Sequence, residues 1–233
     1  MQIRCSLLGE IMTTSRVKSD PLSETCKAKL IEIFVQERYG RNKFVVSRAI
    51  EKGLRVEEDG ITLLSRLHKT FYVKNEKRYH NDYLTGTPDI VHDGIIIDIK
   101  SSWDPFTFYK NLCSSLNKIY YWQMMGYMAL TGLKKAVVAY VLVDTPESII
   151  DREKRDLEYK MGLCDPSVLD REFKAIDKRC RVDDIAMSER LITFDVERDE
   201  EAISSIYERI EHCREFLGEL EESVDGLWLN TLC

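Results

Sequence analysis

The chain has 233 residues, of which 44% are hydrophobic and 32% charged, a composition typical of one compact globular domain spanning 1–233. It contains no uninterrupted apolar run of about 18 residues, and its N-terminus lacks the charged-then-apolar layout of a secretory signal, so neither a membrane span nor export is expected. The net charge of −6 argues against indiscriminate polyanion binding, although residues 1–143 carry +6 and residues 144–233 carry −12.

Basic residues are concentrated near the N-terminus, where residues 16–55 hold ten basic and five acidic side chains. Such a run is either a solvated helix face or a surface that meets phosphates. The cysteines, seven in number, stand at positions 5, 26, 113, 164, 180, 213 and 233. Because they include no C-x-x-C pair, we interpret them as reduced cytoplasmic thiols that mostly serve packing.

The first half of the chain shows signals for two helices and three strands. The predicted helices cover 22–39 and 47–67, and the predicted strands cover 70–74, 83–91 and 95–101. Asp20-Pro21 and Gly40 give the first helix its start and stop signals. Asp93-Gly94 between the last two strands indicates a two-residue hairpin turn.

The second half predicts a crossover and a long terminal helix. The expected elements are a helix over 115–131, a strand over 136–143, a charge-rich helical insertion over 147–188, a strand over 191–196 and a helix capped by Asp199. A strand, a helix and a strand at this spacing imply a right-handed crossover onto the same sheet. The fold class is therefore α/β, a mixed central sheet flanked by helices, with its core at about 1–146 and 189–223.

The hairpin brings two carboxylates together. With Asp93 and Gly94 as the turn, Asp89 lies opposite Asp98 and alternation puts Lys100 on the same face. Two carboxylates at about 5 Å would repel by roughly 3 kcal/mol at an effective dielectric of 20, and a sheet needs compensation for such a pair. A divalent cation between the two carboxylates would replace this repulsion by attraction.

Glu57 is a candidate third carboxylate. If 47–67 is one helix, Ile50, Leu54, Ile61 and Leu64 define its apolar face, and Glu57 falls near the middle of that face. A glutamate facing inward is costly unless it is paired or ligates a metal. The alternative is an ordinary helix-surface glutamate that points to solvent.

Four short motifs together resemble a known nuclease superfamily. The segments 86–89 (GTPD) and 98–100 (DIK) resemble the PD-(D/E)xK signature, with Asp in place of the commoner Glu. Segment 123–127 (QMMGY) is similar to the Q-x-x-x-Y motif of the RecB-type and phage-exonuclease branches, and 53–57 (GLRVE) to the G-x-x-x-E motif of the phage lambda exonuclease, YqaJ-like branch. The resemblance implies a restriction-endonuclease-like core.

The resemblance also implies a metal site. Glu57, Asp89, Asp98 and the backbone carbonyl of Ile99 would hold one or two Mg²⁺ ions, with Mn²⁺ as a substitute, and the all-oxygen set suits such a cation. Lys100 would orient or help to deprotonate the attacking water, if burial or a nearby metal ion depresses its pKa.

Further residues are assigned to DNA by the same resemblance. Gln123 would approach the metal-site nucleotide or the 5′ phosphate, and Thr87 would contact a phosphate. Arg4 and Ser6 loosely match an Arg- and Ser-bearing first helix, at a shorter spacing than the family pattern. Tyr127 shares a helix face with Gln123, and the alternative for Tyr127 is that it packs the helix.

Aromatic residues also follow the strand that carries Lys100. Trp103, Phe106, Phe108 and Tyr109 are expected in a loop, where they would either stack on bases or close over the core.

The motifs predict a Mg²⁺-dependent deoxyribonuclease, a 5′-to-3′ exonuclease on duplex DNA ends in phage-type recombination by single-strand annealing. The resemblance implies a homotrimer, a single-strand-annealing partner and the cytoplasm of a bacterial host cell. The alternatives are an endonuclease of restriction or repair type and a catalytically silent DNA-binding protein of the same fold. Silent members should lose carboxylates or the lysine, whereas all four residues (Glu57, Asp89, Asp98 and Lys100) are present.

Overall fold

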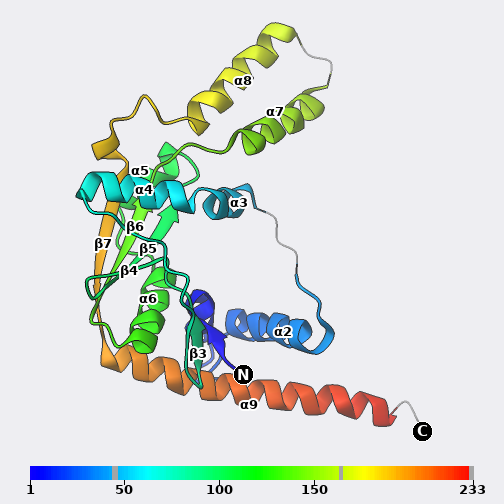
Figure 1. The fold of residues 1–233 in the computed structure, drawn as a ribbon. Coiled ribbons are helices and arrows are strands. Elements are labelled where there is room, and N and C mark those ends of the chain that lie inside the picture. The colour runs from blue at the N-terminus through cyan, green and yellow to red at the C-terminus, as the bar shows by residue number, and fades with distance from the viewer. Residues whose placement is uncertain (44–46, 163–164, 231–233) are drawn as a thin grey trace.

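The computed structural model describes residues 1–43, 47–162 and 165–230, with the backbone alone for 227–230. Its centre is a mixed four-stranded sheet with helices on both faces (Figure 1). The strands, in sheet order, are β4 (Ile90–His92), β5 (Ile95–Ser101), β6 (Lys135–Val141) and β7 (Leu191–Glu197). A smaller three-stranded sheet has the order β1 (Ile3–Arg4), β3 (Leu84–Gly86) and β2 (Tyr79–His80). The predicted α/β class is confirmed.

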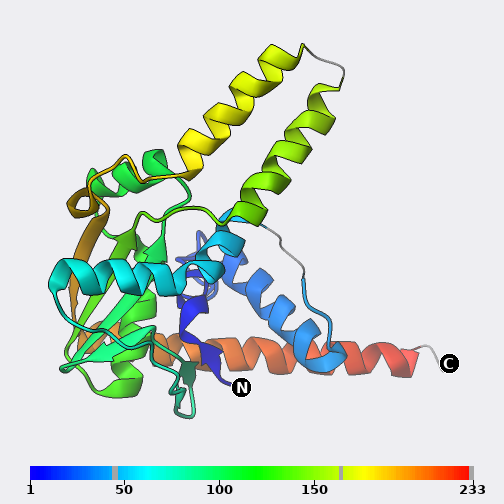
Figure 2. The same ribbon diagram turned by 45° about the horizontal axis from the view of Figure 1, so that its top comes forward.

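Helices cover both faces of the larger sheet. The described part of the chain forms the helices α1 (Leu8–Ile11), α2 (Glu24–Tyr39), α3 (Arg48–Arg55), α4 (Glu57–His68), α5 (Pro105–Leu112), α6 (Lys118–Thr131), α7 (Glu147–Met161), α8 (Pro166–Cys180) and α9 (Glu200–Asn230), with short 3₁₀ turns η1 (Cys5–Leu7) and η2 (Met187–Glu189). None of the helices described is long and apolar enough to cross a membrane. In Figure 2, α7 and α8 project from the body as a hairpin, and α9 runs beneath it.

The β4–β5 hairpin has the predicted register. Ile90 pairs with Ile97, and Asp93 and Gly94 form the turn with φ of 45° and 76°, as a two-residue turn of this hand requires. β6 pairs parallel to β5, and α6 makes the crossover between them. β7 then pairs antiparallel to β6, which completes the mixed sheet.

The two faces of β5 pack against different helices. Ile97 and Ile99 belong to an apolar cluster with Leu64 of α4. Gly60 permits this close approach, because a Cβ there would lie 2.8 Å from Cγ2 of Ile99. On the other face, Ile96 packs in the larger core that includes residues of α6 and α9.

Two predicted helices differ from the structure. The first begins at Glu24 rather than at residue 22, because Ser23 is its N-cap and accepts a hydrogen bond from the Cys26 amide. The second is two helices, since Val56 adopts φ −108° and ψ 13° and separates α3 from α4. A continuous helical wheel over 47–67 is therefore wrong.

The strand predicted over 83–91 is also divided. Its two ends form β3 of the smaller sheet and β4 of the larger sheet. Pro88 lies between these strands and cannot donate a backbone hydrogen bond to a neighbouring strand. Residues 70–74 form no strand. The aromatic segment after β5 is not a loop but the helix α5, which Asp104 and Thr107 begin with a capping box. Phe108 of α5 is buried in the core, whereas Phe106 is exposed.

The charge-rich segment forms the predicted helices α7 and α8. A small apolar cluster of Ile150, Ile176 and Cys180 joins them, and α3 is tied to α7 by the ion pair of Arg48 with Asp156. Four of the cysteines, Cys5, Cys26, Cys180 and Cys213, are buried free thiols as expected, and Cys113 is an exposed one. Cys164 and Cys233 lie outside the described residues.

Candidate active site

Asp89 and Asp98 face the same space beside β5. Asp98 is fully buried and accepts a hydrogen bond of 3.2 Å from Nε2 of Gln123. Asp89 precedes β4, and its Oδ2 accepts a 2.7 Å hydrogen bond from the amide of Ile99. The hairpin register predicted that Asp89 and Asp98 approach each other. Asp89 is held against the backbone of β5, the strand that carries Asp98.

Burial disfavours charge on both groups, and the charge of Asp98 adds to this effect at Asp89. Burial, followed by the charge of Asp98, raises the pKa of Asp89 to about 7. Burial likewise raises the pKa of Asp98, against the lowering effect of Lys100. These directions agree with the repulsion inferred from the sequence, because a carboxylate that is desolvated beside another carboxylate holds its proton more tightly.

Lys100 completes this cluster. Its Nζ lies 2.6 Å from Oδ2 of Asp98 and 4.8 Å from the centre of the Tyr120 ring. Burial acts to lower the pKa of Lys100, but the charges of Asp98 and Asp89 outweigh it and the pKa is raised. The depressed pKa expected from the sequence is therefore not found in this geometry, and Lys100 is a cation at neutral pH.

Glu57 does not join the two aspartates. It is the first residue of α4, and its carboxylate pairs with Nζ of Lys74 at 3.1 Å. The wheel argument that aimed it inward fails, since Ile50 and Leu54 are 56% and 74% exposed. Among the residues described, no group of three His, Cys, Asp or Glu side chains is close enough to hold a metal ion. The charge of Glu57 nevertheless contributes to the raised pKa of both Asp89 and Asp98, so Glu57 lies in their neighbourhood.

Gln123 and Tyr127 connect the aspartates to Thr87. Both lie on α6 and are almost fully buried. Nε2 of Gln123 donates to Asp98 and, at 3.0 Å, to the hydroxyl of Tyr127, which donates to the carbonyl of Thr87 at 3.3 Å. Gly86 permits this packing because a Cβ there would lie 2.7 Å from the Tyr127 ring. Tyr127 thus both packs and extends the polar network.

A hollow of about 320 Å³ opens beside Thr87 and Tyr127. Parallel pairing of β1 with β3 brings Arg4 opposite Thr85, so that Arg4 and Ser6 line this hollow together with Arg78. Nε of Arg78 donates to the Thr85 hydroxyl at 2.9 Å. We call it the Arg4–Arg78 pocket. The sequence analysis missed Arg78, whose only signal is the basic run at 74–78.

Lys52 departs from the expectation for the basic run at 16–55. It is 1% exposed and donates to the carbonyl of Trp103 at 3.0 Å, which ties α3 to the segment that follows β5. Burial lowers the pKa of Lys52 to about 8. This lysine therefore belongs neither to a solvated face nor to a phosphate-facing surface.

The aspartate pair suits a hard cation. Oδ2 of Asp98 is buried, and the ammonium of Lys100 lies 2.6 Å from it. Two neighbouring carboxylates whose pKa values are raised by burial are relieved by a divalent ion that accepts oxygen ligands. The residues present therefore fit Mg²⁺, which Asp89 and Asp98 would hold.

Comparisons with known proteins place this geometry in context. No family model and no curated protein matches the sequence. Among solved structures, a phage-related exonuclease from Haemophilus somnus 129PT is 27% identical with a TM-score of 0.78, covering 96% of each chain. The alkaline exonuclease LHK-Exo from Laribacter hongkongensis is 16% identical with a TM-score of 0.64, covering 99% of this chain and 93% of its own. LHK-Exo in complex with dAMP gives a TM-score of 0.62.

The fold is thus that of the PD-(D/E)xK nucleases, arranged around an aspartate pair and a lysine on one hairpin. The likeness to the phage-related exonuclease confirms the resemblance to the lambda exonuclease branch that the four motifs predicted, and LHK-Exo shares the fold.

Proposed function

We propose that the protein is a Mg²⁺-dependent exonuclease that degrades one strand of duplex DNA from its 5′ end. The observation that carries the proposal is the continuous polar network from Lys100 through Asp98, Gln123 and Tyr127 to Thr87. This network connects Asp98 to Tyr127, which lines the Arg4–Arg78 pocket. The likeness to two exonucleases supports the same chemistry.

The residues of the site have two roles, metal binding and orientation of the nucleophile. Asp89 and Asp98 would hold Mg²⁺, with the Ile99 carbonyl and Glu57 as further ligands once Glu57 leaves Lys74. When bound, Mg²⁺ supplies a Lewis acid that activates water and stabilises charge on the phosphoryl oxygens. Lys100, kept protonated by the aspartates, orients the nucleophile and stabilises developing negative charge.

The Arg4–Arg78 pocket would bind the 5′-terminal phosphate. Two guanidinium groups and the hydroxyls of Ser6 and Thr87 line it, and arginine is well suited to phosphate oxygens because it donates in a planar fork. A pocket that recognises a terminal phosphate makes cleavage dependent on a DNA end. This end dependence favours an exonuclease over an endonuclease.

The test is digestion of linear duplexes that carry a 5′ phosphate or a 5′ hydroxyl, together with a closed circle, in Mg²⁺ and in chelator. We expect progressive loss of the 5′-phosphorylated strand in Mg²⁺ alone. Cutting of the circle would instead indicate an endonuclease. Binding without cleavage on every substrate would indicate a silent DNA-binding protein.

Assembly and partner follow from the same resemblance. We propose a homotrimer in the cytoplasm of a bacterial host cell, acting with a single-strand-annealing protein in phage-type recombination. Light scattering at working concentration tests the assembly, and a monomeric mass would contradict it. Co-purification of the annealing protein with the tagged full chain tests the partner.

A further inference from the structure

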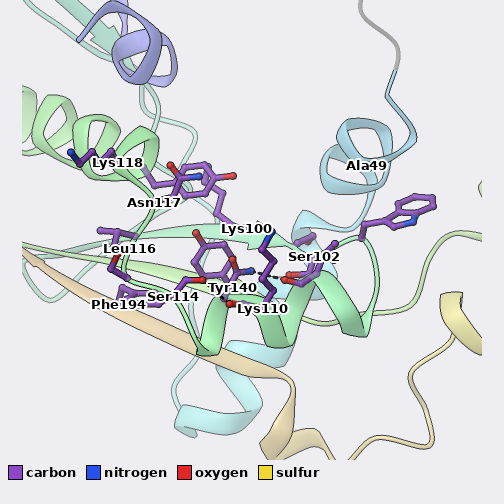
Figure 3. Close-up of a pocket in the computed structure, with 16 residues that line it drawn as sticks. Ala49, Lys100, Ser102, Lys110, Ser114, Leu116, Asn117, Lys118, Tyr140 and Phe194 are labelled. Carbon is purple, nitrogen blue, oxygen red and sulfur yellow. Dashed lines mark hydrogen bonds between the residues drawn. The ribbon is translucent and has the colours of Figure 1, made fainter. Parts of the chain in front are cut away.

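A larger hollow of about 680 Å³ lies at the carboxyl end of β5, next to Lys100. Residues of α5, of the segment 113–117 and of the start of α6 form most of its lining, and Tyr140 and Phe194 of the sheet also line it (Figure 3). We call it the α5–α6 pocket. No step proposed above uses its lining except Lys100.

The α5–α6 pocket is basic in an acidic protein. Its lining includes Lys100, Lys110 and Lys118 and no Asp or Glu, although the chain carries a net charge of −6. Lys110 and Lys118 are exposed, and within the described part of the chain neither of them forms an ion pair. The N-terminus of α6, capped by Asn117, adds partial positive charge at the same place. The pocket therefore favours an anion.

Its location relative to the aspartates is set by α6. Lys118 and Tyr120 line the α5–α6 pocket, Gln123 contacts Asp98, and Tyr127 lines the Arg4–Arg78 pocket. Because a helix rises about 1.5 Å per residue, the two pockets lie on opposite sides of the aspartate pair, each within roughly 8 Å of it along the axis. Neighbouring phosphates of one DNA strand can therefore reach all three places.

We propose that the α5–α6 pocket binds the phosphodiester backbone of the cleaved strand on the 3′ side of the scissile bond, with Lys110 and Lys118 on its phosphates. The polarity rests on the proposed function, since a 5′ phosphate in the Arg4–Arg78 pocket directs the remaining strand to the other side of the aspartates. The polar lining of Ser114, Ser115 and Asn117 provides hydrogen-bond donors but no base-specific pair. Binding in this pocket is therefore independent of sequence.

The first experiment measures affinity in chelator, so that no cleavage occurs. Fluorescence anisotropy with a 5′-phosphorylated duplex compares the wild type with Lys110→Ala, Lys118→Ala and the double variant. Each lysine removed should reduce the slope of log affinity against log salt by about 0.9, on the order of eightfold in affinity at 0.1 M salt. Lys135→Ala is the matched control, because Lys135 is an exposed lysine at the opposite end of β6 from Tyr140.

The second experiment locates the contact along the strand. It uses 5′-phosphorylated substrates with one, two or four nucleotides beyond the scissile bond, in Mg²⁺. KM of the wild type should fall as nucleotides are added, and the double variant should lose this gain while retaining the wild-type kcat/KM on the shortest substrate. Equal loss on all lengths, or no loss of affinity and salt slope, would overturn the proposal. If the wild type cleaves nothing, the proposed function fails, whereas the anisotropy slopes still decide whether the lysines bind DNA.

Discussion

Strand β5 has two faces with opposite chemistry. Ile97 and Ile99 pack against α4 in an apolar cluster, whereas Asp98 and Lys100, one position along, face α6 and form a buried ion pair. Burial of the apolar face stabilises the folded state, and desolvation of the charged groups on the polar face offsets part of this stabilisation. The comparison indicates that one face of the strand stabilises the unfavourable arrangement held on the other.

The largest expected effect is on activity. Asp98→Asn removes one proposed cation ligand and the partner of Lys100, so kcat should fall by on the order of 10²–10³-fold or more. The measurement is 5′-strand digestion in Mg²⁺, with the far-ultraviolet circular dichroism unchanged. Asp195→Asn, an exposed aspartate on β7, is the control and should digest DNA at the wild-type rate.

Substitutions on the apolar face of β5 should change stability rather than catalysis. Ile97→Ala leaves a cavity against α4, and the free energy of unfolding should fall by about 2–4 kcal/mol. Urea denaturation measures the loss. Activity per folded molecule should remain near that of the wild type, and a selective loss of kcat would show that the two faces are not separable.

The aspartate pair should make stability depend on pH when metal is absent. The unfolded chain releases the Asp89 proton near its ordinary pKa of 3.8, whereas the folded protein keeps it until about 7. The unfolded state thus binds fewer protons in this window, and the free energy of unfolding should fall as pH rises from about 4 to about 7.

Denaturation in chelator at pH 5 and pH 8 tests this sign. Asp89→Asn should flatten the dependence, and Mg²⁺ should raise the melting temperature of the wild type at pH 8 but have little effect on the variant. A wild type that Mg²⁺ leaves unchanged would contradict cation binding between the aspartates.

The smallest effect concerns Gly60. Alanine there favours the helix by about 1 kcal/mol, but its Cβ would lie 2.8 Å from Ile99 and 3.0 Å from Val141, an overlap that costs about 1–3 kcal/mol. Gly60→Ala should therefore lower the free energy of unfolding by about 1 kcal/mol. Increased stability would show that α4 can move away from the sheet.

The hairpin shows what the sequence could predict. Asp93-Gly94 determines a turn by local conformation, so the pairing of β4 with β5 and the approach of Asp89 to Asp98 followed correctly. Terminal signals were similarly local. Asp199 begins α9 by accepting from the amides of Glu201 and Ala202.

Features that depend on tertiary contacts were not predictable in this way. The helix breaks at Val56, where the sequence has neither Gly nor Pro to indicate a break. Because of this break, the inward direction assigned to Glu57 is wrong. Pro88 does indicate a break between two strands, but the residues on both sides have a strand pattern, so one continuous strand was predicted. Arg78 enters its pocket only because β1 and β2 flank β3, an arrangement that no local pattern encodes. Whether the named residues perform the proposed roles stays a prediction.

Helix α6 has a consequence for how relatives of this chain can vary in length. A single inserted or deleted residue between Tyr120 and Tyr127 would turn everything beyond it by about 100° and shift it by about 1.5 Å, which would separate Gln123 either from Asp98 or from Tyr127. The preceding segment 113–117 lies between α5 and α6 and carries no helical register that an insertion would shift. Length changes among related sequences should therefore accumulate before Lys118 and be absent within the helix.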